Sequence, residues 1–293
     1  MLPRRHIRIK VFQSLYTYSQ KFHHQSFDFR KEFTKNLEAY LNLYYLITHL
    51  LFLIRKIAKE EININKKKLL PNENDLNPNT RFIQNSTLQA ITSKKKYIHI
   101  DDHKIQNIAK SILKKMKKTN IYSEYMHQES NDAEIGKILI LKILKHQIII
   151  NEKIHDFIEE HSIYWNDDLL IVYNTLLEKI NNDQNLNILE LFRHKEDKTF
   201  AYRLLEKSVE KADEINQIIF ELAKNWDKDR IAISDLIIMR MAITEMRYFT
   251  NIPHKVTLDE YIDISKEYSS PKSKEFINGI LDKYTKDILE KKL

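Results

Sequence analysis

Three arginines near the beginning of the chain have the residue type and spacing that could bind a phosphate backbone. Arg4, Arg5 and Arg8 follow Pro3, which suits the first position of a helix. On a helix of 3.6 residues per turn, the three side chains fall within an arc of about 100°. Cations there oppose the helix dipole, whereas the free N–H groups of the first turn attract anions. A bound phosphate would resolve this conflict, and a solvated basic end is the alternative interpretation.

A helix within residues 1–20 must position these arginines. Ile7, Val11, Leu15 and Tyr18 trace one apolar stripe at helical spacing. The stripe predicts which side of the helix is buried.

The most strongly patterned stretch, residues 225–284, predicts three further helices. The first, about 235–249, is apolar nearly all round, which is typical of a helix in the middle of a bundle. Thr257 and Glu260 have capping-box spacing and predict the start of the second helix. Ser270-Pro271 predicts the start of the third.

The third of these helices contains Asn278-Gly279, a pair that usually signals a turn. A glycine inside a helix costs about 1 kcal/mol relative to alanine, and the chain has only 2 glycines. The bare backbone therefore predicts a close approach, either by a neighbouring helix or by a ligand.

Several spaced motifs follow one another in fixed order. The motifs of the C-terminal stretch are Asp229-Arg230-Ile231, then Asp235, Met239-Arg240, Ala242-Ile243 and Glu245, then Pro253-His254-Lys255-Val256 with Glu260, and finally Phe276-Ile277-Asn278-Gly279-Ile280-Leu281-Asp282. With these motifs the stretch resembles the NusB family of transcription antitermination proteins. Gln13-Ser14-Leu15-Tyr16, after the arginines, is similar to a motif in the first helix of that family.

The resemblance implies an RNA-binding protein without catalysis of its own. In the family, the first helix contacts a short single-stranded RNA element called boxA. The implied partner is NusE, a small-subunit ribosomal protein, and the implied role is to help RNA polymerase resist termination on ribosomal RNA transcripts. Arg4, Arg5 and Arg8 occupy family arginine positions, whereas His6 replaces a further arginine of many members.

Nine residues form the RNA site that the resemblance implies. The arginines would contact phosphates. Tyr16 and Phe276 would stack on unpaired bases. Asn278 and Asp235 could bond base edges, and Gly279 would permit close approach. Glu275 replaces a family lysine, and Lys274 and Lys272 lie just upstream as the basic residues at this edge. The expected set is Arg4, Arg5, Arg8, Tyr16, Asp235, Lys274, Phe276, Asn278 and Gly279.

The recurring apolar period near 3.6 and the scarcity of glycine and proline predict an all-α fold. The expected architecture is a NusB-like bundle of two helical subdomains, 1–212 and 213–293, with a family-atypical helical insertion at about 27–195. Helical patterns in that insertion cover residues 33–54, 102–118, 133–161 and 167–180, and a long loop is expected at 64–96.

Composition and spacing argue against several other functions. Without cysteine, disulfides and thiol chemistry are excluded. Two Glu-x-x-His pairs, Glu124/His127 and Glu152/His155, and a cluster at residues 99–103 could ligate metal. Such pairs are expected by chance in this composition, so no metal and no cofactor are predicted. The net charge of +7 suits a polyanion partner. We find no signal peptide, and the apolar run 41–54 is too short for a membrane span, which predicts a soluble cytoplasmic protein.

Two other functions remain open from the sequence. A helical protein-interaction adaptor with a NusB-like fold would fold normally but bind no specific RNA. An RNA methyltransferase is a further option, because NusB-like domains precede some of these enzymes. The scarcity of glycine argues against a nucleotide-cofactor domain.

Overall fold

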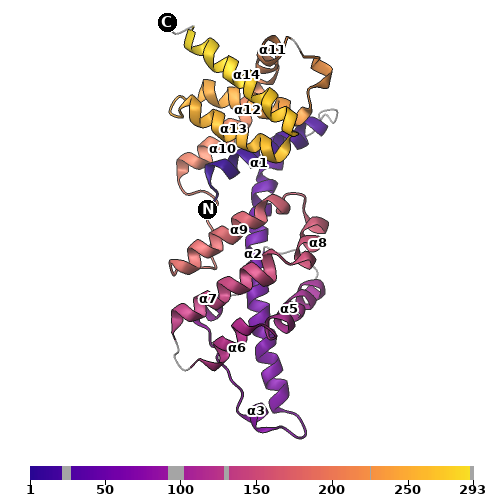
Figure 1. Ribbon diagram of the computed structural model, residues 1–293, viewed down its shortest axis with the longest axis vertical. Helices are drawn as coiled ribbons and strands as arrows, with labels where there is room; N and C mark the ends of the chain where they lie inside the picture. Colours follow the sequence, from indigo (N-terminus) through magenta and orange to yellow (C-terminus); the bar gives the residue numbers. More distant parts are fainter. Residues whose placement is uncertain (22–27, 92–101, 129–131, 225, 291–293) are drawn as a thin grey trace. The chain divides into compact units, whose positions relative to one another are not determined.

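The computed structural model describes residues 1–21, 28–91, 102–128, 132–224 and 226–290, and every regular element within these ranges is a helix (Figure 1). The predicted all-α class is therefore confirmed. The helices are α1 (Arg4–Lys21), α2 (Phe29–Lys66), α3 (Glu73–Leu76), α4 (Ser86–Ala90), α5 (Asp102–Met116), α6 (Asn120–His127), α7 (Ala133–Ile143), the π-helix η2 (Leu144–Ile149), α8 (Glu152–His161), α9 (Trp165–Asn181), α10 (Lys195–Glu210), α11 (Ala212–Leu222), the 3-10 helix η3 (Lys228–Arg230), α12 (Ile233–Tyr248), α13 (His254–Tyr268) and α14 (Pro271–Glu290).

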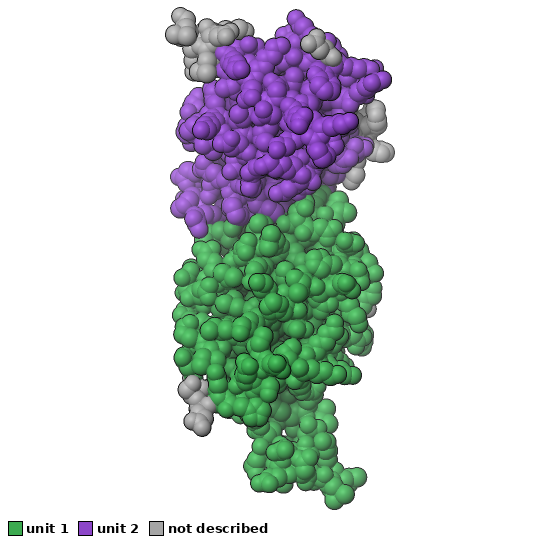
Figure 2. Space-filling view, viewed as in Figure 1, with its two compact units in different colours: residues 1, 38–191 green, residues 2–37, 192–293 purple. Residues whose placement is uncertain are grey.

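The chain divides into two compact units, which are coloured separately in Figure 2. We call Glu38–Leu191, together with Met1, the middle unit, and Leu2–Leu37 with Phe192–Leu293 the terminal unit. The division falls inside α2, whose first residues belong to the terminal unit. The two subdomains predicted to meet at residue 212 are a different division of the chain and stay a prediction.

Helix α12 forms the centre of the terminal unit. Ile237, Ile238, Met241 and Ile243 are each 0% exposed although they point in different directions around the helix. Helices α1, α10, α11, α13 and α14 all contact α12. The sequence-based prediction of a central helix apolar on nearly every face is thus confirmed.

The helix starts near the C-terminus agree with the prediction in one case and not in the other. Helix α14 begins at Pro271, and the Ser270 hydroxyl accepts a hydrogen bond from the Ser273 N–H at 3.2 Å, as expected for a cap. The capping box at Thr257 is wrong, because α13 begins three residues earlier, at His254. The Thr257 hydroxyl is buried and donates instead to Glu245 Oε1 at 2.9 Å.

The middle unit is built along α2, which is much longer than the predicted helix 33–54. Helix α2 contacts α9 and the segment that follows it, where Leu186 O accepts a hydrogen bond from the Tyr44 hydroxyl at 3.0 Å. The Tyr40 and Thr175 hydroxyls are 3.1 Å apart, and Trp165 Nε1 donates to Ala39 O at 2.8 Å. The predicted helix 133–161 is divided into α7, η2 and α8. The predicted loop 64–96 begins inside α2 and contains the short helices α3 and α4.

In the described part of the chain, α2 alone is long and apolar enough to cross a membrane by length and composition. Within its most apolar window, 72% is buried inside the structure, as in the core helix of a soluble protein. This is weak evidence for a membrane span.

Candidate nucleic-acid interface

The buried face of α1 fixes the directions of the three N-terminal arginines. Ile7 and Val11 are 0% exposed and Leu15 is 1% exposed, so the predicted apolar stripe faces the core. The helix packs against α10 and α12. Arginines near this stripe must therefore find partners inside the bundle, whereas those away from it reach the surface.

Arg8 lies inside the terminal unit. Its Nε and Nη2 donate to the two carboxylate oxygens of Glu245 at 2.9 and 2.7 Å, and only 4% of its side chain is exposed. Burial by itself would lower the pKa of Arg8, but the hydrogen bonds and charge of Glu245 outweigh burial and raise that pKa. This burial argues against the predicted phosphate contact. Arg8 instead joins α1 to α12.

Arg4 and Arg5 remain at the surface, each beside a carboxylate. Arg4 Nε donates to Asp197 Oδ1 at 2.9 Å, and 44% of the Arg4 side chain is exposed. Arg5, 41% exposed, pairs with Asp263. Lys266 and then Arg5 hold the pKa of the Asp263 carboxyl below its usual value. A phosphate that bound either guanidinium group would compete with its carboxylate partner.

Tyr16 lies near the opposite end of α1 from Arg4. Twelve residues at 1.5 Å each place the two about 18 Å apart along the helix. Tyr16 is 41% exposed, and its ring centroid lies 6.3 Å from that of Phe12. Phe12 in turn lies 4.8 Å from Tyr268, at the end of α13. The predicted phosphate-binding and stacking residues of α1 thus occupy separate ends of the helix.

Phe276 on α14 forms an aromatic pair with a residue that the sequence analysis did not include. The ring centroids of Phe276 and Trp226 are 4.7 Å apart with an interplanar angle of 50°. Trp226 is 58% exposed, which is unusual for so large an apolar side chain. Its place just before the Asp229-Arg230-Ile231 motif is the sequence signal that could have identified it.

The other α14 residues of the predicted site lie near this aromatic pair in sequence. Asn278 is half-buried and donates from Nδ2 to Asp282 Oδ2 at 3.1 Å. Lys274 is also half-buried. A Cβ added at Gly279 would meet nothing within 4 Å, so no neighbouring helix requires a glycine there. Of the two explanations for Gly279, close approach by a neighbouring helix is not supported, and close approach by a ligand stays a prediction.

Asp235 is buried rather than available to a base. It is 4% exposed, and its Oδ1 accepts hydrogen bonds from the Ser269 and Ser234 hydroxyls at 2.6 and 3.3 Å. These bonds tie the first turn of α12 to the end of α13. They argue against the predicted contact with a base edge.

The two histidines of the Glu-x-x-His pairs have partners other than a metal. Among the residues whose placement is described, no group of three or more His, Cys, Asp or Glu could hold a metal ion. A ring nitrogen of His127 lies 2.8 Å from Ser123 O, and one of His155 lies 2.7 Å from Ile149 O. Residues 99 and 101 of the predicted cluster lie outside the described residues.

These features define a helical-bundle protein that carries cations and aromatic rings on its surface. A NusB family model matches residues 166–286 of the chain. Three proteins named transcription antitermination protein NusB are similar to it. The one from Thermodesulfovibrio yellowstonii is 38% identical over 115 residues, which are 39% of this chain and 75% of the relative.

The second, from Alkaliphilus oremlandii, is 36% identical over 110 residues, covering 36% of this chain and 80% of the relative. The third, from Chloroherpeton thalassium, is 41% identical over 85 residues, covering 29% of this chain but only 40% of the relative. No solved structure matches the chain. The chain belongs to the NusB family. The family match begins at residue 166, so α1 and most of the middle unit lie outside it.

Proposed function

We propose that the protein is an RNA-binding transcription antitermination factor. It recognises boxA-like RNA in ribosomal RNA transcripts together with the ribosomal protein NusE, and acts in an antitermination complex with RNA polymerase. The observation that carries this proposal is the similarity to relatives whose names describe transcription antitermination. In this proposal the protein binds and positions RNA and performs no reaction of its own.

The exposed and half-buried members of the predicted site supply the contacts. Arg4 and Arg5 bind phosphates and give the affinity its salt dependence. Tyr16 and Phe276 stack on unpaired bases, as aromatic side chains do in single-strand binding. Arg8 and Asp235 act indirectly, because their hydrogen bonds hold α1 and α12 in position.

Near Phe276, two further residues of α14 act on the RNA directly. The half-buried Asn278 offers its amide to a base edge, and the open surface over Gly279 lets the strand approach the backbone. Lys274 supplies a positive charge at the same edge.

Binding to a boxA-type RNA and to a scrambled RNA, measured over a salt series with and without NusE, tests the proposal. We expect a preference for the boxA sequence. Arg4→Ala/Arg5→Ala should weaken binding and reduce the salt slope by about 1 for each phosphate that is no longer neutralised. The control is Arg30→Ala/Lys35→Ala, which removes two exposed cations from the beginning of α2. A folded protein that shows no preference even with NusE would contradict the proposal.

One observation favours a helical adaptor without specific RNA binding as the second candidate. Each of the three N-terminal arginines pairs with a carboxylate of its own chain, so none requires an external anion. The same salt series decides between the candidates, because an adaptor would show no salt-sensitive RNA binding.

A further inference from the structure

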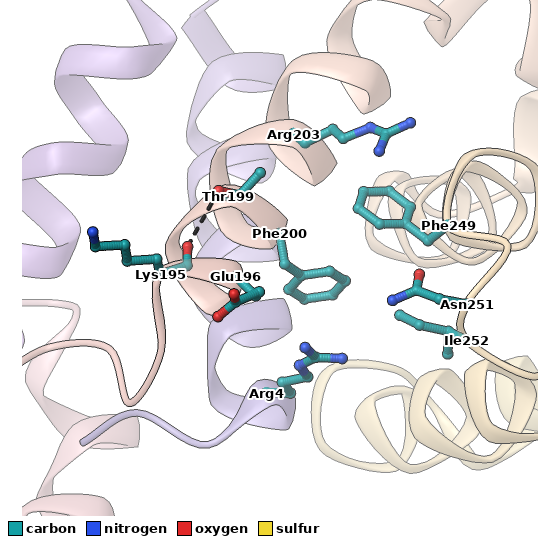
Figure 3. A pocket seen from close by; sticks show the side chains of 9 residues that line it. All are labelled: Arg4, Lys195, Glu196, Thr199, Phe200, Arg203, Phe249, Asn251 and Ile252. Carbon is teal, nitrogen blue, oxygen red and sulfur yellow. Dashed lines mark hydrogen bonds between the residues drawn. The ribbon is translucent and has the colours of Figure 1, made fainter.

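A pocket of about 260 Å³ opens in the terminal unit beside Arg4 (Figure 3). It is formed by the start of α1, the first turns of α10 and the segment that joins α12 to α13. Its volume lies just below the range of about 300–1,000 Å³ that holds drug-sized ligands. It therefore suits one small chemical unit or part of a chain. The lining residues are Arg4, Lys195, Glu196, Thr199, Phe200, Arg203, Phe249, Asn251 and Ile252.

The floor of the pocket is apolar and rigidly packed. Phe200, Phe249 and Ile252 are 5%, 6% and 7% exposed. The two phenylalanine rings meet edge to face, with centroids 5.2 Å apart. A ligand would therefore pack against these rings without entering between them.

Two guanidinium groups flank these rings. The Arg4 group lies 5.4 Å from the centroid of Phe200, and the Arg203 group lies 5.1 Å from that of Phe249. In the view of Figure 3 they lie below and above the two rings, whereas the Lys195 ammonium points away from them. Planar guanidinium groups can bind phosphate oxygens and can also stack on a nucleobase.

We propose that this pocket holds one nucleotide of a bound single-stranded RNA. The base or ribose packs on the apolar floor, and the adjoining phosphates contact Arg4 and Arg203. The two-part lining carries the proposal. A simple anion would match the guanidinium groups but not the apolar floor, and a purely apolar ligand would match the floor but not the guanidinium groups. The proposal rests on the proposed RNA-binding function and extends it to residues of α10 and of the α12–α13 connection.

Two polar side chains, Asn251 and Glu196, are also among the lining residues and give the pocket a means of selecting a base. The Asn251 amide can both donate and accept a hydrogen bond, and the Glu196 carboxylate can accept one from an exocyclic amine. Glu196 also opposes a free phosphate, which favours a nucleotide held by its base over an inorganic anion.

A single introduced thiol tests the occupancy directly, because the chain contains no cysteine. In Asn251→Cys the thiol lies in the pocket lining, at an exposed position whose replacement should not disturb the core. With the boxA-type RNA at about 100 times its dissociation constant, alkylation should slow by up to about a hundredfold. In the control Lys198→Cys, which places a thiol on the exposed side of α10 outside the lining, alkylation should not slow.

Two further ligands identify what occupies the pocket. Uridine 5′-monophosphate or inorganic phosphate, each at the same concentration as the RNA, should give no protection. Protection by either one but none by RNA would overturn the proposal and indicate a small-molecule site.

The affinities of two more variants separate this proposal from the proposed function. Arg203→Ala should weaken RNA binding and reduce the salt slope by about 1, whereas Lys198→Ala removes the same charge from the same helix with little effect. If the wild-type protein binds boxA RNA but Arg203→Ala matches Lys198→Ala and the pocket thiol is unprotected, the pocket proposal fails alone. If the wild-type protein binds no RNA, both proposals fail.

Discussion

The carboxylate of Glu245 accepts both hydrogen bonds of a bidentate pair from Arg8, a residue 237 positions earlier in the chain. The Thr257 and Tyr261 hydroxyls donate to the same carboxylate at 2.9 and 3.1 Å. Glu245 is 0% exposed, so its charge is removed from water. Such a charge is tolerated only where a counter-ion and hydrogen bonds compensate for the missing solvation. One carboxylate therefore joins α1, α12 and α13.

Arg8→Ala should be strongly destabilising, because it leaves the Glu245 charge buried without its counter-ion. Removing one partner of a buried pair costs about 3–5 kcal/mol of unfolding free energy. Urea unfolding followed by circular dichroism measures this decrease. Arg5→Ala, which removes a half-exposed surface pair, should cost no more than about 1 kcal/mol. Equal decreases in unfolding free energy for the two variants would show that the buried pair contributes no more to stability than the surface pair.

Gly279→Ala should stabilise the fold and weaken RNA binding. The new methyl group meets no atom within 4 Å, and alanine is better than glycine in a helix by about 1 kcal/mol. If RNA approaches the bare backbone, the same methyl group obstructs it. Urea unfolding and RNA titration of one preparation measure both effects, and unchanged affinity would remove Gly279 from the interface.

Gly136→Ala is the matched control, because it makes the same change in the other glycine of the chain. There the methyl group would lie 2.9 Å from Asn85 Nδ2. The Asn85 side chain is held by hydrogen bonds to Gly136 O and from the Leu88 N–H. Crowding of a packed site typically costs about 1–3 kcal/mol, which offsets the helix gain of about 1 kcal/mol, so this variant should be less stable than Gly279→Ala and should show no net stabilisation over wild type.

Tyr40 should make the protein sensitive to alkaline pH. Burial raises the pKa of the Tyr40 hydroxyl to about 12 from its usual value of 10.0. Unfolding above pH 10 therefore releases a proton. Below pH 10, Tyr40 makes its full contribution to the free energy of unfolding. As the pH rises towards 12, about 2–3 kcal/mol of that free energy is lost. Urea unfolding between pH 9 and 12 should show a shallower decline for Tyr40→Phe, and parallel curves would contradict this assignment.

Trp226 should report RNA binding through its fluorescence. The only other tryptophan, Trp165, is 6% exposed, so a base that stacks on the surface can reach only Trp226 directly. We expect boxA RNA to quench the emission of the wild-type protein and of Trp165→Phe, but not that of Trp226→Ala. The last variant should also bind RNA more weakly by about 1–3 kcal/mol, the usual value of one base–aromatic stack. Unquenched emission at saturating RNA would place the bases elsewhere.

The local pattern of the sequence predicted where most helices lie, because apolar residues three or four positions apart mark a buried face. It missed the full length of α2 and the division of residues 133–161 into α7, η2 and α8. The apolar surround of α12 predicted its central place, and Ser270-Pro271 predicted the start of α14. The capping box at Thr257 failed because its hydroxyl bonds Glu245, a partner on another helix. The capping-box spacing considers only residues close in the sequence and so cannot predict a hydrogen bond to another helix.

The sequence by itself determined the all-α class, the family motifs and the residue types that could bind RNA. Tertiary structure decided which of those residues reach the surface. Arg4, Arg5 and Arg8 look alike in the sequence, yet Arg8 and Asp235 are enclosed by partners from distant segments whereas Arg4 lines a pocket. The physical reason is that exposure and pairing depend on which helices pack together: Glu245 pairs with Arg8 from another helix, and Ser269 reaches Asp235 from the end of α13.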